Sequence, residues 1–144
     1  MTDANSDGVG AGTSTAVTST INITPINDAP VMTAGATLSY TENETATVID
    51  NTITITDDDD IEISFGTVAI TSGITMGDTL TLGTQNGISG VYSDSVLTIN
   101  GTASLSEYET ALQSITYHSS SEDPTITADS RTISWMVTDA NSEI

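Results

Sequence analysis

The sequence is short of several residue types, and each shortage excludes a class of function. It has no cysteine, so it can form neither a disulfide framework nor a thiolate metal site. Arg131 is the one basic residue beside 20 acidic residues, and the formal net charge is -19. A chain with so few cations cannot replace the counterions of a nucleic acid, and anionic membrane surfaces repel it. It also has no apolar run long enough to insert into a membrane.

The acidic residues that remain point towards cations. A surface of this charge repels itself unless cations neutralise it. Hard cations such as Ca²⁺ prefer carboxylate, amide and carbonyl oxygens, which are abundant in this chain. An acidic surface of the halophile type, kept for solubility, is the alternative explanation, and composition leaves both open.

Short β-branched stretches separated by turn residues dominate the 144 residues. Apolar and polar residues alternate in Ile53–Thr56 and in Leu97–Asn100, as expected for half-buried strands. This pattern predicts an all-β, antiparallel β-sandwich. The strands are expected at 36–41, 46–56, 61–71, 78–82, 89–93, 95–100, 114–119 and 131–139, with an edge strand at 13–24.

One segment, residues 104–113, predicts a short helix instead. Leu105, Tyr108 and Leu112 follow helical spacing, and Ser104 with Glu107 forms a capping-box signature. We expect this helix to cross one end of the sandwich.

Side chains with oxygen donors gather where predicted strands end. Loops at the same end of a sandwich converge, and calcium needs six to eight oxygens, usually from several loops. The sequence therefore predicts a Ca²⁺ site. The expected ligands are Asn27, Asp28, Glu42, Asn43, Asp57, Asp59, Asp139 and Asn141, with Asp3, Asn5 and Asp60 as secondary candidates.

Several motifs resemble the cadherin-like tandem repeats of giant bacterial surface adhesins of the RTX type. They are "INITPINDAPV", "TEN", "TDDDD", "LTINGTASLSEYETALQSITYHSSSEDP" and "RTISWMVTDANS", and together they cover nearly the whole chain. The long run from "LTINGT" to "SITY" is the most specific of these, whereas an Asn-Asp-x-Pro linker alone is weak evidence.

This resemblance implies an immunoglobulin- or cadherin-like sandwich that acts as an extender module, stiffened by calcium at each junction. It also implies a protein exported by type I secretion to the bacterial cell surface, in biofilm-forming adhesins. The linker pair of the family matches Asn27 and Asp28. The linker departs from that of classical cadherins, because Ala29 stands in place of the final Asn and the leading Asp is missing. We therefore expect fewer ions at each junction than in animal cadherins.

The segment "TDANS" occurs twice, at 2–6 and at 138–142, which suggests one period of a tandem array. Met1 then looks like an initiator added to an excised fragment. In this interpretation residues 1–25 hold a loop and the last strand of the preceding repeat, 26–34 form a calcium-binding linker, and 35–144 form the sandwich. We expect adjacent repeats as partners, with strand 13–25 donated head-to-tail to another copy. The alternative makes 13–25 the first strand of a self-contained domain.

Other functions are weaker in the sequence. A module that grips a sugar or peptide through calcium would need exposed aromatic residues, and Tyr40, Tyr92 and Tyr117 are the candidates. We expect these tyrosines to pack in the sandwich, and we expect Phe65 and Trp135 to fill its core. An enzyme is not expected, because His118 has no nucleophile motif around it.

Overall fold

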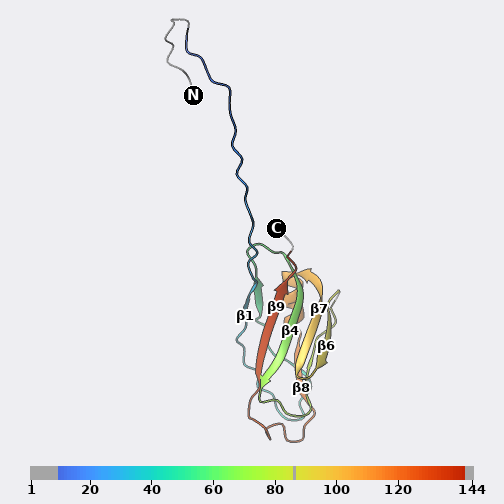
Figure 1. Cartoon of the computed structure of the whole chain (residues 1–144). Coiled ribbons are helices and arrows are strands. Elements are labelled where there is room, and N and C mark those ends of the chain that lie inside the picture. The colour runs from blue at the N-terminus through green and yellow to red at the C-terminus, as the bar shows by residue number, and fades with distance from the viewer. Residues whose placement is uncertain (1–9, 86, 142–144) are drawn as a thin grey trace.

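The computed structural model describes residues 10–85 and 87–141, which fold into two layers with a long N-terminal tail (Figure 1). An antiparallel four-stranded sheet, in the order β6-β7-β4-β9, forms one layer. The second layer consists of the sheet β2-β8-β5, the pair β1-β3 and one helix, α1. The predicted all-β sandwich with a single short helix is confirmed. The elements are β1 (Val31–Thr33), β2 (Thr47–Val48), β3 (Thr54–Thr56), β4 (Glu62–Ser72), β5 (Asp78–Thr81), β6 (Ser89–Ser93), β7 (Val96–Ser104), α1 (Leu105–Gln113), β8 (Thr116–Ser119) and β9 (Thr132–Asp139).

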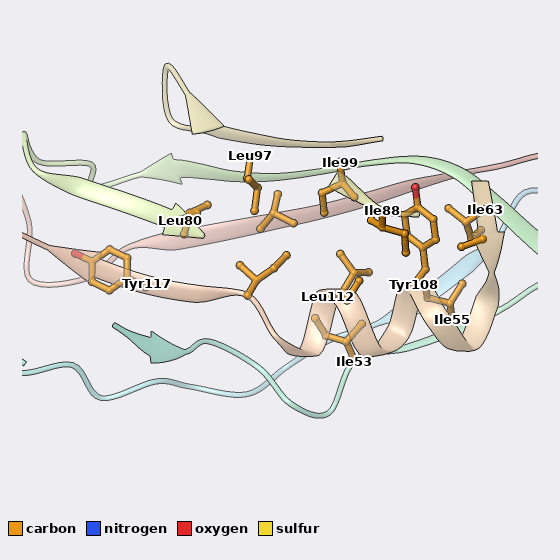
Figure 2. Close-up of a cluster of buried hydrophobic side chains, with 14 of the residues drawn as sticks. Ile53, Ile55, Ile63, Leu80, Ile88, Leu97, Ile99, Tyr108, Leu112 and Tyr117 are labelled. Atoms are coloured by element: carbon orange, nitrogen blue, oxygen red, sulfur yellow. The ribbon is translucent and has the colours of Figure 1, made fainter. Parts of the chain in front are cut away.

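The core lies between the two layers and is built mainly from aliphatic side chains (Figure 2). Leu97 and Ile99 of β7 face Leu112 of α1, and Tyr108 of α1 is fully buried beside them. The Tyr108 hydroxyl donates a 2.6 Å hydrogen bond to the Gly101 carbonyl, so its one polar atom is satisfied.

The central strand β4 contains an irregularity that changes which side chains face inward. Its register against both neighbours shifts between Ile63 and Phe65, as a β-bulge does. The bulge turns Phe65 outward, with 36% of its surface exposed, so the prediction that Phe65 fills the core was wrong. Gly66 takes the inward position, where an added Cβ would lie 3.7 Å from the ring of Tyr108.

Helix α1 begins at the capping box that the sequence predicts. It packs beside β3, and its side chains hydrogen-bond to the backbone there. Ser104 accepts from the Glu107 N–H, and the Glu107 carboxylate accepts from the Ser104 N–H at 2.9 Å. Glu109 accepts from the Ile55 N–H at 2.7 Å, and the Gln113 amide donates to the Ile53 carbonyl at 2.7 Å. Within the described residues, no helix is long and apolar enough to cross a membrane.

The segment before β3 differs from its prediction. Residues 36–41 form no strand, and the expected strand 46–56 divides into β2 and β3. The buried carboxylate of Asp50 is the reason for the division. It accepts hydrogen bonds from the N–H groups of Gly35, Ala36 and Thr52 at 2.8–3.0 Å, so the chain bends around it. The expected linker 26–34 also contains the short strand β1, which pairs with β3.

Residues 14–29 are extended and exposed, and they form no strand with the sandwich. They continue along the long axis of the sandwich and away from it (Figure 1). Within the described residues, Thr13 forms an isolated β-bridge and residues 14–24 belong to no sheet, so the edge strand predicted at 13–24 does not form there.

Candidate metal centre where the linker meets the sandwich

Three carboxylates converge where the linker joins the sandwich. Asp57 and Asp60 belong to the loop that follows β3, and Asp139 is the last residue of β9. An oxygen of each lies within 4.8 Å of an oxygen of the other two. Asp60 is 3% exposed, and Asp57 and Asp139 are half-buried.

The acidic loop holds its own shape through backbone hydrogen bonds. One oxygen of Asp57, Oδ1, accepts from the N–H groups of Asp59 at 3.1 Å and Asp60 at 2.9 Å. These bonds close a tight turn and leave the second oxygen of Asp57 for another partner. Asp139 forms a similar local hydrogen bond at the end of β9, where its Oδ1 accepts from the Asn141 N–H at 3.0 Å.

The linker is tied to both loops. The Asn27 side-chain amide donates to Asp139 Oδ2 at 3.2 Å, and the Asp28 N–H donates to Asp59 Oδ2 at 3.0 Å. The structure therefore brings together residues that are more than 100 positions apart in the sequence. Asn27, Asp28, Asp57, Asp59 and Asp139 lie in one cluster, as the sequence predicts for the ends of converging loops.

The electrostatics of this cluster favour a cation. The Asp57 Oδ2 and Asp59 Oδ1 atoms are buried and have no hydrogen-bond partner within the described residues. Burial raises the pKa of Asp57, but the N–H groups of Asp59 and Asp60 outweigh it and hold that pKa below its usual value. The Asp28 N–H lowers the pKa of Asp59, but burial and the neighbouring Asp57 together raise it above its usual value.

The donor set consists of carboxylates, with no nitrogen or sulfur ligand among the three that converge. Two carboxylates about 5 Å apart repel each other by roughly 3 kcal/mol at an effective dielectric constant of about 20. Arg131, the one basic residue, is engaged with Asp78 elsewhere in the fold. Orphaned carboxylate oxygens, mutual repulsion and the lack of a nearby base fit a hard divalent cation.

Comparison with known proteins gives one match. No family model matches the chain, and no solved structure matches it. The chain is similar to halomucin. It is 35% identical over 108 residues to halomucin of Haloquadratum walsbyi, a match that takes in 69% of this chain and 1% of halomucin. The chain thus spans about one hundredth of this relative's length. The resemblance to cadherin-like adhesins is not tested by the halomucin match and stays a prediction.

Two expected ligands, Glu42 and Asn43, lie outside the cluster. They occupy a turn in which Tyr40 donates a hydrogen bond to the Glu44 carbonyl. The Tyr40 ring packs edge-on against Tyr117 of β8, with the ring centroids 4.9 Å apart. Figure 2 shows Tyr117 at one end of the core and Ile55, two residues before Asp57, towards the other, so the turn lies at the far end of the sandwich from the acidic loop. Asp3 and Asn5, which were secondary candidates, fall outside the described residues.

That far end carries a second charged group, which the sequence analysis did not single out. Asp78 is 5% exposed and accepts from the guanidinium of Arg131, from the Tyr117 hydroxyl at 2.8 Å and from the Thr75 N–H at 2.9 Å. Burial and the Asp78 carboxylate raise the pKa of Tyr117 to about 12. Every charge here has a partner, so this group stabilises the fold and offers no open ligand position. The lone Arg in a chain of this charge was its only signal in the sequence.

Proposed function

We propose that the chain is a structural spacer repeat of a very long extracellular protein and that Ca²⁺ stiffens its junction with the preceding segment. The name halomucin supports an extracellular setting, because mucins are extracellular proteins. The match covers only 1% of halomucin, which supports a role as one part of a very long protein. A sandwich with an acidic cluster at the end that meets the linker suits a mechanical role better than a catalytic one.

The observation that carries this proposal is the position of the acidic cluster. Its carboxylates come from the sandwich, and they contact the linker directly through Asn27 and Asp28. Asp57, Asp59, Asp60 and Asp139 would hold the ion. A bound Ca²⁺ supplies the positive charge that the cluster lacks, and it joins linker and sandwich into one rigid unit. Without it, Asn27 and Asp28 are held to the acidic loops by two hydrogen bonds between exposed groups.

The first experiment is a thermal melt at fixed protein concentration with 10 mM CaCl₂ and with excess EDTA. Extracellular calcium modules bind with dissociation constants of about 10⁻⁴–10⁻³ M. A site at the tighter limit would be stabilised by about 2.7 kcal/mol, which raises the melting temperature by about 10 °C. We expect Asp57→Asn and Asp139→Asn each to abolish most of this calcium-dependent rise.

Asp58→Asn is the matched control. Asp58 lies in the same loop and is exposed, and this variant makes the same change in charge. It should keep the full calcium response. Equal responses in all three variants, or no response in the parent protein, would contradict a calcium site in this cluster.

Adaptation to high salt is a second explanation of the negative charge, and the names in the halomucin match favour it. The names of halomucin and of Haloquadratum both refer to salt, which fits an acidic surface adapted to high salt. Such a surface responds to ionic strength in general. The calcium-binding proposal requires a response to millimolar Ca²⁺ at constant ionic strength. A ligand-binding adhesin module is less well supported, because Tyr40 packs against Tyr117, and Tyr117 lies at the opposite end of the core from Ile55 and the acidic loop after it (Figure 2).

A further inference from the structure

The four-stranded sheet has an unpaired edge. Its order is β6-β7-β4-β9, and β9 pairs with β4 alone among the described strands. The side chains of β9 alternate, with Ile133, Trp135 and Val137 half-buried and Met136 on the outer face. An edge strand of eight residues with an apolar inner face is a template for another strand.

A cavity runs beside this edge. Its volume is about 470 Å³, and it lies between β9 and the segment 34–40. Its apolar walls come from five half-buried side chains: Leu38, Tyr40, Ile49, Ile133 and Trp135. The segment 36–41 has a strand-like sequence but no strand partner. One additional strand in this cavity would give β9 a second neighbouring strand and would lie beside this segment.

The extended N-terminal tail, residues 14–29, has properties that complement this free edge of β9. Its residues are extended, and Val17, Ile21 and Ile23 share one face because they are separated by even numbers of positions. These three side chains are 94%, 84% and 86% exposed. The opposite face is polar, with Thr20 and Asn22. An apolar face exposed along a whole segment is characteristic of a strand that lacks its sheet.

The internal repeat relates the tail to β9. "TDANS" at 138–142 begins at the end of β9, and "TDANS" at 2–6 is followed by the Gly-rich residues 7–12 and then by the tail. The tail is therefore the kind of strand that follows a β9-like strand after a short connection. Strands joined by such short connections pair in an antiparallel manner.

We propose that residues 17–24 of one copy add to the free edge of β9 in a second copy, antiparallel to it, with Ile21 and Ile23 in the cavity beside Trp135 and Ile133. The occupant is a second copy of this chain. This assembly goes beyond the spacer function and does not require calcium.

The tail cannot fill the same position in its own sandwich. Asn27 is hydrogen-bonded to Asp139, at the end of β9. An antiparallel tail would place Thr24 near Thr132, roughly 23 Å from that end. The three residues from Thr24 to Asn27 reach about 11 Å at most. A second copy, stacked in the same orientation along the tail, meets no such limit, and its own tail extends the stack into an open chain.

The test measures self-association of the whole chain by light scattering after size exclusion over a hundredfold range of concentration, in Ca²⁺ and in EDTA. The variant Ile21→Asp/Ile23→Asp places charge on the apolar face of the tail. The control Thr18→Asp/Thr20→Asp makes the same change on the polar face. Because these exposed residues do not pack on the sandwich, both variants should melt as the parent does when dilute. We expect the first variant to associate at least ten times more weakly than the parent, and the control to associate normally.

Trp135, the only tryptophan, provides a second measurement. A synthetic peptide of residues 13–25, added to Ile21→Asp/Ile23→Asp protein, should shift the Trp135 emission to the blue and saturate. The same peptide carrying the two Asp substitutions should not. A parent that stays monomeric at every concentration, together with no peptide effect on Trp135, would overturn the proposal. Equal association of the parent and Ile21→Asp/Ile23→Asp would also overturn it. A calcium effect on melting without association would leave the spacer function standing and remove only the strand exchange.

Discussion

At the residue scale, the carboxylates differ in how their oxygens are satisfied. Asp50 is 3% exposed, and its two oxygens accept four hydrogen bonds from Gly35, Ala36 and the backbone and hydroxyl of Thr52. Asp57 is only partly satisfied, because its Oδ2 has no hydrogen-bond partner within the described residues. The sequence shows both as acids beside polar residues. The difference is created by the backbone N–H groups that the fold directs at each carboxylate.

Asp50 gives a prediction about pH. Burial raises its pKa, but the hydrogen bonds outweigh burial and lower the pKa from 3.8 to about 2. A folded pKa below the unfolded one means that the stabilisation is complete above about pH 4 and is lost as the pH falls towards 2. We expect Asp50→Asn to lower the free energy of unfolding by about 2 kcal/mol at pH 6, because its amide would meet N–H donors.

Urea unfolding of the parent and Asp50→Asn proteins between pH 2 and pH 7 measures this difference. It should shrink as the pH falls below 4. Asp129→Asn changes an exposed residue by the same charge and should stay within about 0.5 kcal/mol of the parent. A difference for Asp50→Asn that does not depend on pH would contradict the role given to its ionised form.

At the element scale, a sequence motif predicted an element correctly where the groups that bond to each other are close in the sequence. The start of α1 depends on Ser104 and Glu107, three residues apart, and the structure confirms their reciprocal bonds. Residues 36–41 alternate as a strand does, yet a strand needs a neighbour, and the described residues provide none. The bulge in β4 likewise arises from pairing with β7 and β9, and it moved Phe65 to the surface.

The capping box gives the prediction at this scale. Ser104→Ala removes the acceptor of the Glu107 N–H, which should lower the free energy of unfolding by about 1 kcal/mol. Ser106→Ala, on the exposed first turn of the same helix, should have little effect. Chemical unfolding with far-UV circular dichroism compares the two. Equal losses would show that the helix start does not depend on the cap.

For the whole molecule, charge and shape act together. The net charge of -19 is spread over 144 residues, so repulsion is general, whereas the acidic cluster concentrates part of it at the junction with the linker. Salt screens exposed charges over about 3 Å at 1 M and about 10 Å at 0.1 M, but it screens partly buried groups much less. NaCl should therefore weaken the general repulsion between surface charges, whereas the acidic cluster should respond to Ca²⁺.

We expect the melting temperature to rise by about 5 °C or more between 0.05 M and 1 M NaCl as surface repulsion is screened. At 1 M NaCl, adding 10 mM CaCl₂ should raise it further in the parent. Asp57→Asn should keep the NaCl response and lose the additional calcium response. If 1 M NaCl removes the calcium response from the parent, the ion acts by screening and not at a site.

The sequence by itself determined the all-β class, the helix with its cap, and most of the acidic cluster. These rest on alternation, short-range capping and the meeting of loops at strand ends, which are encoded within a few residues. Only the tertiary structure decided that Asp60 stands among the converging carboxylates, that Glu42 and Asn43 lie at the other end, and that Arg131 neutralises Asp78. It also showed that, among the described strands, β9 is paired on one side only, and that residues 14–24 join no sheet with the described residues. These facts depend on which distant segments the packing brings together, and a linear pattern does not specify that.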